Sequence, residues 1–482
     1  MDIYYRPEWT CGKYNTQAQT AILYNLIEGC SHFFEGASAM VIGEIIAYGR
    51  NHSLSINRLA DKSGIEIDSI IDFCEQLLQL GLLTNHIFSS EEIIQYRQAV
   101  AKRNQDTYDQ SKNMPNGVDV MELGLLGAEE DYAKSIKGWS NVVFEMTYRC
   151  SEHCIHCYNV GSTHYKTDID RRGERIELSL DEYKQVIDQL LAMGMFKVCL
   201  TGGDPFSNPI TWKVLEYLYE QEVAVEIYTN GISITNQIDR LVSLYPRIVG
   251  MTVYSAVDAI HDKITRVQGS LKKTLCSMKR LSEMAVPLQL KCCVFNTNFE
   301  SYKSVYPLAK EFCALPQIEI NIKNTIDGNK FASKFLRLTD EQYECLFKDP
   351  NIYPFIKDDS LNHLIPRNYT ENVCKTGVNS CTITPEGNII PCPAFHLVLG
   401  NIRLSSVSDI FEGAELNKWK EITLQDYSEC GTHNYCDFCS ICPGENYSDT
   451  NNPLAPSENK CFMAKKRWTY ANKIHHKSNG KI

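Results

Sequence analysis

Apolar runs of strand length alternate with amphipathic helical segments through the middle of the chain, from Asn141 to Asn324. The runs that resemble buried strands are Val142–Met146, Lys197–Leu200, Val223–Tyr228, Arg247–Tyr254, Leu288–Phe295 and Ile318–Ile322. Between them, helical spacing marks Leu180–Met193, Thr211–Gln221, Gln237–Leu244, Lys272–Met284 and Tyr302–Phe312. Successive strand–helix units predict a parallel sheet with right-handed crossovers. Six units, where a closed TIM barrel has eight, predict an α/β fold built on a partial TIM-like barrel.

The first ninety residues have a different pattern and predict a separate small unit. Short strands are expected at Ile3–Tyr5 and Lys13–Asn15, and helices at Thr16–Ile27 and Ser38–Tyr48. The segment 55–85 then holds two helices that meet at a Ser-Gly pair, the second ending at a glycine, which is typical of a helix-turn-helix. We therefore expect a winged-helix-like domain.

Charge decides which partner this first unit suits. Residues 1–90 carry ten acidic and five basic side chains, so a nucleic acid is a poor partner. A winged helix can instead hold an extended peptide along a strand edge by β-augmentation, and we expect Ile3–Asn15 to be that edge. Peptide recognition is favoured, a purely structural cap is the alternative, and DNA binding is the least favoured interpretation.

A cysteine motif follows the first barrel strand. Cys150, Cys154 and Cys157 are spaced C-x3-C-x2-C on the loop that leaves the carboxyl end of this strand, the end that carries the chemistry in α/β barrels. A [4Fe–4S] cluster normally takes four thiolates, so three would leave one iron open to a small molecule. Zinc prefers paired C-x2-C units with a fourth ligand; zinc and buried structural thiols are the alternatives.

Further motifs stand at the next strand ends. After the second strand, Gly202 and Gly203 would let the backbone approach a ligand closely, and Asp204 could take a charged amine; alone, this is a common loop. Asn230 lies in a turn after the third strand, and Ser255 follows the fourth. Ser270 is expected to be the N-cap of a helix over 271–281.

Taken together, these motifs resemble the radical S-adenosylmethionine (SAM) enzymes: the TYRC…C.HCY motif comes first, then Gly-Gly-Asp in place of the family's GGE. The resemblance implies that the open iron chelates the amino and carboxylate groups of SAM, and that an electron from the cluster yields a 5′-deoxyadenosyl radical. It also implies contacts of the adenine with His156, of the methionine amine with Gly202, Gly203 and Asp204, and of the ribose with Ser255. Asn230 would lie beside the cofactor.

Cysteine density rises again beyond residue 370. The cysteines there are Cys374, Cys381, Cys392, Cys430, Cys436, Cys439, Cys442 and Cys461. Eight thiols suffice for two more [4Fe–4S] clusters, although C-x2-C pairs also suit zinc. The segment 382–390 predicts a β-hairpin that would bring Cys381 and Cys392 side by side.

This cysteine-rich region is similar to the SPASM domain, which carries auxiliary iron–sulfur clusters. Its C-x5-C-x2-C-x2-C spacing departs from the usual C-x2-C-x5-C-x3-C. We assign the ligands as two sets: Cys374, Cys381, Cys392 and Cys442 for the first cluster, and Cys430, Cys436, Cys439 and Cys461 for the second. A single auxiliary cluster with spare thiols is the alternative.

The expected organisation is a winged-helix-like peptide-recognition domain (1–90), a linker (91–140), the radical SAM partial barrel (141–325), a bridge (326–370), a SPASM-like domain (371–470) and a tail (471–482). Within the linker, Glu129-Glu130-Asp131 is expected to be a solvated face.

Composition narrows the cellular setting. The chain has 482 residues, a net charge of −11 and no long uncharged apolar run, so neither a membrane span nor a phosphate-backbone partner is expected. Its polar start is unlike a signal peptide. Twenty cysteines without such a signal indicate metal ligation in a reducing cytoplasm.

The resemblance implies a maturase that abstracts hydrogen from a ribosomally made precursor peptide and installs a crosslink such as a thioether. Its partners would be that precursor, bound by the amino-terminal domain, and an electron donor such as flavodoxin or ferredoxin. Two alternatives stay open: a sulfatase-maturing-type oxidation of a protein Cys or Ser, and a non-enzymatic iron–sulfur regulator with a helix-turn-helix.

Overall fold

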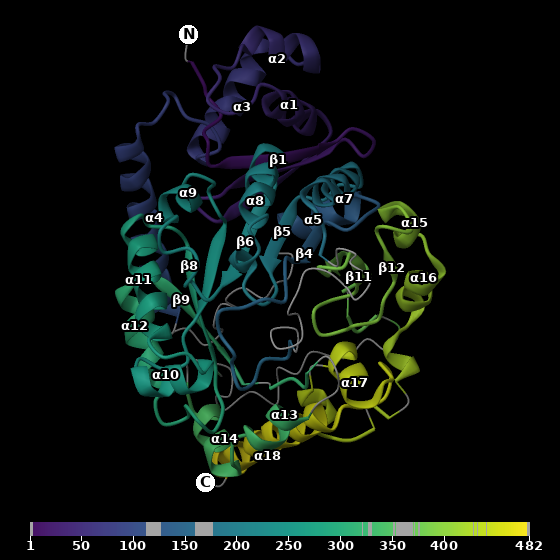
Figure 1. Cartoon of the computed structure of the whole chain (residues 1–482). Helices are drawn as coiled ribbons and strands as arrows, with labels where there is room; N and C mark the ends of the chain where they lie inside the picture. The colour runs from purple at the N-terminus through teal and green to yellow at the C-terminus, as the bar shows by residue number, and fades with distance from the viewer. Residues whose placement is uncertain are drawn as a thin grey trace.

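The computed structural model contains two sheets, a three-stranded one near the amino terminus and a nine-stranded one in the body of the protein (Figure 1). It describes residues 3–111, 127–159, 177–320, 322–325, 330–349, 352, 370, 372–374, 376–427, 429–430, 432–439 and 441–479. Of the bridge predicted for 326–370, the structure describes residues 330–349, 352 and 370.

The amino-terminal module consists of β1 (Thr10–Asn15), β2 (Thr20–Asn25), β3 (Cys30–Glu35), α1 (Gly36–Ala47), α2 (Ile56–Ser63) and α3 (Ile67–Gln79). The linker helices are α4 (Ser90–Ser111) and α5 (Ala128–Ser135). The strands are antiparallel in the order β1-β2-β3, with α1 to α3 following them in the chain. The helices predicted over 38–48 and 55–85 are confirmed, and Gly64 ends α2 with a left-handed φ of 69°.

The helix predicted for Thr16–Ile27 is wrong. This segment forms the central strand β2, and all six of its residues are buried. A short apolar run fits a buried strand as well as a helix face, and periodicity alone cannot separate them. The neglected signal was Asn15, whose side chain accepts hydrogen bonds from the N–H groups of Gln17 (3.0 Å) and Ala18 (3.1 Å) and so forms the turn that starts β2. The strand expected at Ile3–Tyr5 is reduced to isolated bridges of Tyr5 with Ser53 and Thr84.

The body of the protein is the predicted partial barrel. Its strands are β4 (Asn141–Glu145), β5 (Lys197–Thr201), β6 (Ala224–Thr229), β7 (Ile248–Thr252), β8 (Leu288–Cys293) and β9 (Ala314–Glu319), all parallel in register. Its helices are α7 (Leu180–Ala192), η1 (Pro205–Ser207), α8 (Thr211–Glu220), α9 (Ile238–Val242), α10 (Asp258–Thr265), α11 (Ser270–Glu283), η2 (Tyr302–Ser304) and α12 (Val305–Glu311). The last strand begins four residues before its predicted start.

The carboxyl-terminal region extends the same sheet. Its elements are α13 (Phe331–Phe335), α14 (Asp340–Phe347), β10 (Ser380–Ile383), β11 (Asn388–Ile390), β12 (Gly400–Asn401), α15 (Val407–Phe411), α16 (Ala414–Glu421), η3 (Leu424–Asp426), η4 (Cys436–Phe438), α17 (Pro443–Thr450) and α18 (Glu458–Asn479). The predicted hairpin is confirmed as β10 and β11. Strand β10 also pairs in parallel with β4, so side chains of both regions, such as Phe144 and Ile383, lie in one hydrophobic core.

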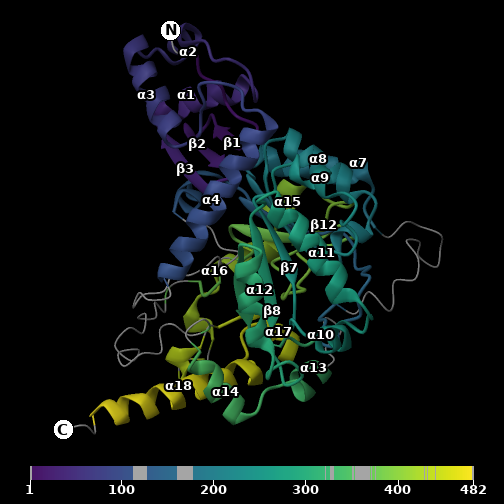
Figure 2. The same cartoon turned by 90° about the vertical axis from the view of Figure 1, so that its left-hand side faces the viewer.

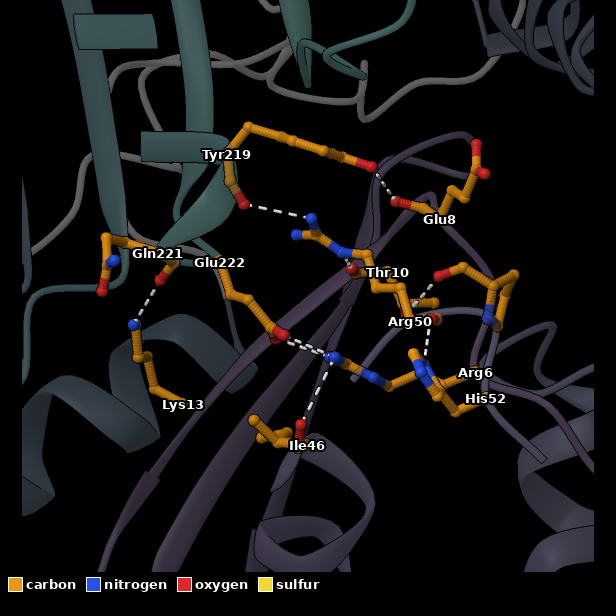
Figure 3. A network of polar contacts seen from close by, with 11 residues as sticks. Arg6, Glu8, Thr10, Lys13, Ile46, Arg50, His52, Tyr219, Gln221 and Glu222 are labelled. Carbon is orange, nitrogen blue, oxygen red and sulfur yellow. Dashed lines mark hydrogen bonds and ion pairs between the residues drawn. The ribbon is translucent and has the colours of Figure 1, made fainter. Parts of the chain in front are cut away.

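The amino-terminal module lies against the end of the barrel where the strands begin (Figures 1 and 2). Three of its cations meet the carboxyl end of α8, just before β6 (Figure 3). Arg6 pairs with both carboxylate oxygens of Glu222, Lys13 donates to the Gln221 carbonyl (2.6 Å), and Arg50 donates to the Tyr219 carbonyl (3.0 Å). Cations at a helix carboxyl terminus complement its dipole and its free carbonyls.

This contact also occupies one edge of the small sheet. The Thr10 carbonyl of β1 accepts from Arg50 (2.9 Å), and Lys13 of the same strand reaches the barrel. The outer side of β1 therefore faces the barrel, contrary to the expectation that Ile3–Asn15 offers an open edge. The other edge strand is β3.

A buried charged network closes the amino-terminal end of the barrel. The Lys197 ammonium lies 2.8 Å from Glu129 of α5, and Arg247 pairs with Glu226 of β6. The Tyr24 hydroxyl of β2 donates to Glu129 as well. Glu129 is only 2% exposed, so its prediction as part of a solvated face is wrong, because the partners that neutralise it come from distant strands.

Among the described residues, no helix combines the length and the apolar character that a bilayer crossing requires.

We predict that Arg6→Met lowers the free energy of unfolding of the full chain by about 3 kcal/mol, since it leaves Glu222 without its buried cation. Arg6 is fully buried and Glu222 is 16% exposed. Chemical denaturation followed by circular dichroism measures the change. The control is Lys418→Met, which removes an exposed ion pair with Glu415 and should lower the free energy of unfolding by less than about 1 kcal/mol. Equal losses in the two variants would contradict a stabilising role of the buried Arg6–Glu222 pair.

Candidate functional site

The loop after β4 carries Cys150, Cys154 and Cys157 and is anchored to α10. The backbone N–H groups of His153 and Ile155 donate to the carbonyls of Thr265 (2.9 Å) and Ile264 (3.0 Å). Side chains from neighbouring strand ends reach two of the thiols. Asn230 Nδ2, after β6, lies 3.5 Å from Cys150 Sγ, and the Tyr254 hydroxyl, after β7, lies 3.5 Å from Cys154 Sγ. The predicted position at the carboxyl ends of the strands is thus confirmed for this loop.

The Cys150 thiol lies near the carboxylates of Asp204 and Glu152, which both raise its pKa in addition to burial. Burial raises the pKa of the Cys150 thiol to about 12, and burial also raises the pKa of Cys157. Buried thiols remain protonated until a metal displaces the proton. In the described part of the chain, no three potential ligands are close enough together to hold a metal ion. The three cysteines therefore share one loop, but their sulfur atoms are not arranged as a complete metal site.

The Gly202-Gly203 pair packs backbone to backbone against the segment that leads into Cys150. The Gly203 N–H donates to the Thr147 carbonyl (2.7 Å), and the Asp204 N–H donates to the Arg149 carbonyl (2.9 Å). A Cβ at Gly202 would stand 2.3 Å from the Thr147 carbonyl oxygen, and one at Gly203 would stand 2.4 Å from that of Arg149. Only glycine fits this approach.

Asp204 is a buried carboxylate with one oxygen that lacks a hydrogen-bond donor among the described residues. Its side chain is fully buried, and the Thr229 hydroxyl donates to Oδ1 (2.5 Å), while Oδ2 makes no hydrogen bond. Burial raises the pKa of Asp204, against the hydrogen bond from Thr229 and smaller lowering effects of the Ser233 side chain and the Asn230 backbone. Buried acceptors normally have partners, so Oδ2 fits a charged donor supplied by a ligand.

The other sequence-predicted residues surround the same loop. Asn230 donates to the Ser151 hydroxyl (3.0 Å) and accepts from the Ile232 N–H (2.9 Å). The His156 ring lies edge-on to Tyr254, with centroids 5.1 Å apart, and burial lowers its pKa to about 4. Ser255 is fully buried, and its hydroxyl accepts from the Val257 N–H (3.0 Å) at the start of α10.

The prediction that Ser270 is an N-cap is wrong. Gly269 occupies that position, with a φ of 75°, and Ser270 is the first residue of α11. The cap is Asp262, whose carboxylate accepts from the N–H groups of Gly269 (2.6 Å) and Leu271 (3.2 Å) and from the Ser270 hydroxyl (2.9 Å). A carboxylate seven residues before the glycine reaches the helix start only after the intervening turn has formed.

Cysteines of the carboxyl-terminal region gather at two places. Cys430, Cys436, Cys439 and Cys461, the predicted second set, all line one cavity of about 370 Å³. At the other place, burial raises the pKa of Cys392 to about 12, with further increases from Cys442 and Cys374. Cys381 lies within β10, buried in the hydrophobic core that Cys374 and Cys392 border.

A second cavity, of about 460 Å³, connects the loop of Cys157 with this region. It is lined by Tyr158, directly after Cys157, by Asn324 after β9, by Ala394 near Cys392 and by Glu445 near Cys442. We call it the central cavity. Sequence analysis did not identify it, because its wall combines segments from both regions of the chain.

Glu145 is a further polar residue near the central cavity that sequence analysis missed. It is fully buried at the end of β4, and the hydroxyls of Tyr148 (3.1 Å) and Tyr158 (3.5 Å) donate to it. Burial raises the pKa of Glu145 to about 7. The available signal was a carboxylate inside the apolar run VVFEM.

Comparison with known families agrees with this geometry. Residues 144–301 match the radical SAM superfamily, and residues 374–443 match the SPASM iron–sulfur cluster-binding domain. The chain therefore carries a radical SAM domain and a SPASM domain. It is an enzyme, and its cofactors are [4Fe–4S] clusters and SAM. The SPASM match ends before Cys461, although this residue lines the same cavity as Cys430, Cys436 and Cys439.

Two curated proteins are similar to this chain in sequence. The antilisterial bacteriocin subtilosin biosynthesis protein AlbA of Bacillus subtilis is 24% identical over 439 residues, which cover 86% of this chain and 92% of AlbA. The mycofactocin maturase MftC of Mycobacterium tuberculosis is also 24% identical, over 64% of this chain and 79% of MftC.

Solved structures show the same fold. Streptococcus suis SuiB bound to the precursor peptide SuiA aligns over 95% of this chain and 99% of SuiB, with a TM-score of 0.52 and 14% identity. The structure of anSMEcpe with bound AdoMet and the Cp18Cys peptide aligns over 71% of this chain and 99% of anSMEcpe, with a TM-score of 0.52 and 17% identity.

We predict that Gly203→Ala weakens SAM binding to the reconstituted enzyme roughly tenfold or more, a loss of about 1.4 kcal/mol. Its Cβ would collide with the Arg149 carbonyl and push the Asp204 loop off the cysteine loop. Equilibrium dialysis with labelled SAM measures the change. Gly269→Ala is the control, because its Cβ meets no atom within 4 Å and only the positive φ of 75° is strained. Unchanged SAM affinity in Gly203→Ala would show that the close approach is dispensable.

Proposed function

We propose that this enzyme is a peptide maturase that abstracts hydrogen from a ribosomally made precursor and installs a crosslink such as a thioether. The observation that carries the proposal is a separate module whose strand β3 pairs with only one strand of the described residues, fixed to a radical SAM barrel that also bears a SPASM domain. The names of two relatives point the same way, since AlbA belongs to subtilosin biosynthesis and SuiB was solved with a precursor peptide.

In this proposal Cys150, Cys154 and Cys157 hold the radical SAM cluster. Asp204 accepts the methionine amine through its unused Oδ2, with Gly202 and Gly203 keeping the loop close enough for the contact. Asn230 and His156 border the cofactor, and Ser255 contacts the ribose. With SAM bound, the cluster supplies a 5′-deoxyadenosyl radical; the protein orients the peptide and excludes water.

We assign the auxiliary cluster ligands from the two places in the SPASM region where cysteines lie close together. Cys430, Cys436, Cys439 and Cys461 form the second set, supported by their common cavity. For the first set we keep Cys374, Cys381, Cys392 and Cys442. The electrostatic effect of Cys374 and Cys442 on Cys392 supports three of these ligands, whereas Cys381 would have to turn out of the core.

The central cavity is the proposed place of the modified residue. It is lined by Tyr158, directly after Cys157, and by Glu445, three residues after Cys442. A peptide segment in it would therefore lie between the site where the radical forms and an auxiliary cluster. An electron donor such as flavodoxin or ferredoxin would reduce the clusters, in a cytoplasmic setting.

The leader of the precursor would bind along β3. The Gly36 N–H donates to the Gln19 carbonyl across the sheet (2.9 Å), so in an antiparallel pair the alternate residues Ser31 and Phe33 direct their backbone groups to the free edge. A groove of about 500 Å³ lies beside this strand, lined by His32, Leu80 and Phe88 among others. An extended peptide could pair with the edge and place apolar side chains in the groove.

A sulfatase-maturing-type oxidation of a protein Cys or Ser is the second candidate. The likeness to anSMEcpe, solved with a peptide and AdoMet, favours it, but that likeness covers 71% of this chain. The fixed module with a free edge favours the precursor peptide.

We predict that replacing Cys150, Cys154 and Cys157 together with Ala abolishes reductive cleavage of SAM. The auxiliary clusters should survive, because their thiolates come from a different region. Iron analysis after anaerobic reconstitution should fall from about twelve irons per chain to about eight, one cubane fewer. Continued 5′-deoxyadenosine production by the variant would overturn the cluster assignment, and bound zinc in place of iron would overturn the auxiliary sites.

We predict that Ser31→Pro reduces modification of the precursor at least tenfold and leaves peptide-independent SAM cleavage unchanged. Proline removes an N–H group from the free edge of β3. The substrates are candidate precursor peptides, co-expressed with the enzyme and analysed by mass spectrometry. Ser31→Ala keeps the N–H group and should behave as the unaltered enzyme. Full modification by Ser31→Pro would exclude this edge as the leader site.

A further inference from the structure

A buried ion pair lies between the two groups of carboxyl-terminal cysteines. Lys460 Nζ is 3.1 Å from Glu445 Oε1, and their side chains are only 10% and 9% exposed. Glu445 is in the first turn of α17, three residues after Cys442, and Lys460 is in the first turn of α18. The pair thus joins the helix that starts beside one proposed cluster to the helix that carries a ligand of the other.

Both charges act on the cysteines. Burial raises the pKa of the Cys442 thiol; Glu445 raises it further, whereas Lys460 lowers it. In return, Cys442 and Cys439 act to raise the pKa of Lys460, although burial opposes them. Cys442 belongs to the first proposed set, and Cys461, which directly follows Lys460 on α18, belongs to the second. Glu445 also lines the central cavity.

Stability alone does not account for such a pair. Removing two charges from water costs several kcal/mol per ion, and apolar residues of the same volume often serve as well or better. Charges held close to iron–sulfur clusters have a defined effect, however, because the net charge around a cluster sets its reduction potential.

We propose that the Glu445–Lys460 pair sets the reduction potentials of the auxiliary clusters, with Lys460 stabilising the reduced state and Glu445 opposing it. The proposal rests on the ligand assignment made under the proposed function. Both are positioning residues, since they act through the thiolates and not on the substrate.

The sign of each effect follows from Coulomb's law. Reduction adds one negative charge to a cluster, so a nearby ammonium raises the potential and a nearby carboxylate lowers it. The low exposure of both side chains limits screening by solvent ions. Because Lys460 directly precedes Cys461 and is paired with Glu445, three residues after Cys442, Lys460 should influence both clusters and Glu445 chiefly the one at Cys442.

The experiment is potentiometric titration of the reconstituted holoenzyme, followed by electron paramagnetic resonance. Lys460→Met should shift the midpoint potentials of both auxiliary clusters downward. Glu445→Gln should shift the potential of one auxiliary cluster upward. The double variant should return close to the unaltered values, and Lys460→Arg should retain them. The radical SAM cluster, recognised by the change of its signal when SAM is added, is the internal reference and should not shift.

Lys473→Met is the matched control. Lys473 lies on the same helix α18, where it pairs with Glu344 of α14 at an exposed site, with the two side chains 55% and 43% exposed. Its replacement removes one positive charge from the same helix and should leave every potential unchanged. An equal downward shift in this variant would mean that the effect is general and not that of the buried pair.

The outcomes separate this inference from the proposed function. Iron analysis showing no auxiliary clusters in the unaltered enzyme would overturn both. Clusters that are present but show no shift, or that shift in the same direction in Lys460→Met and Glu445→Gln, would overturn the inference alone. If Lys460→Met loses its clusters, the upward shift in Glu445→Gln and the retained potentials in Lys460→Arg still decide it.

Discussion

The buried charges at the amino-terminal end of the barrel hold three parts of the chain in one arrangement. Glu129 comes from the linker, Lys197 and Arg247 belong to the starts of barrel strands, and Tyr24 belongs to the amino-terminal module. Each charge is tolerable in this apolar setting only because the others are in place. The linker helix α5 is therefore an integral part of the barrel, and the module has a fixed orientation on it.

This arrangement places the amino-terminal module and the proposed reaction site at opposite ends of the barrel. The module lies where the strands begin, whereas the cysteine loop, the Gly-Gly-Asp loop and the central cavity lie where the strands end or beyond them. Strand β6 has six residues, so the strands alone account for about 20 Å at roughly 3.3 Å per residue. A precursor bound at β3 has to extend along the outside of the barrel before its core region reaches the central cavity.

Sequence alone predicted the parts of the fold that local pattern determines. The six strands and the helices between them other than α10, the loops that carry Cys150 and Gly202, and the hairpin after Cys381 all depend on short-range periodicity and turn residues. Strand β2 was missed because six consecutive buried residues fit either structure, and Asn15 alone indicated the turn. The role of Asp262, the burial of Glu129 and the pairing of β10 with β4 depend on residues far apart in sequence, so no local pattern contains them.

The helix α8 connects the two ends of the barrel. It starts just after the Gly-Gly-Asp loop, where Asn208 donates to the Met146 carbonyl (2.9 Å), and it ends beneath the cations of the module. An amino-terminal domain transplanted from another protein would meet this helix end. Grafting such a domain onto this barrel therefore requires cations opposite Glu222 and the last carbonyls of α8, so the module is exchangeable only together with that small docking surface.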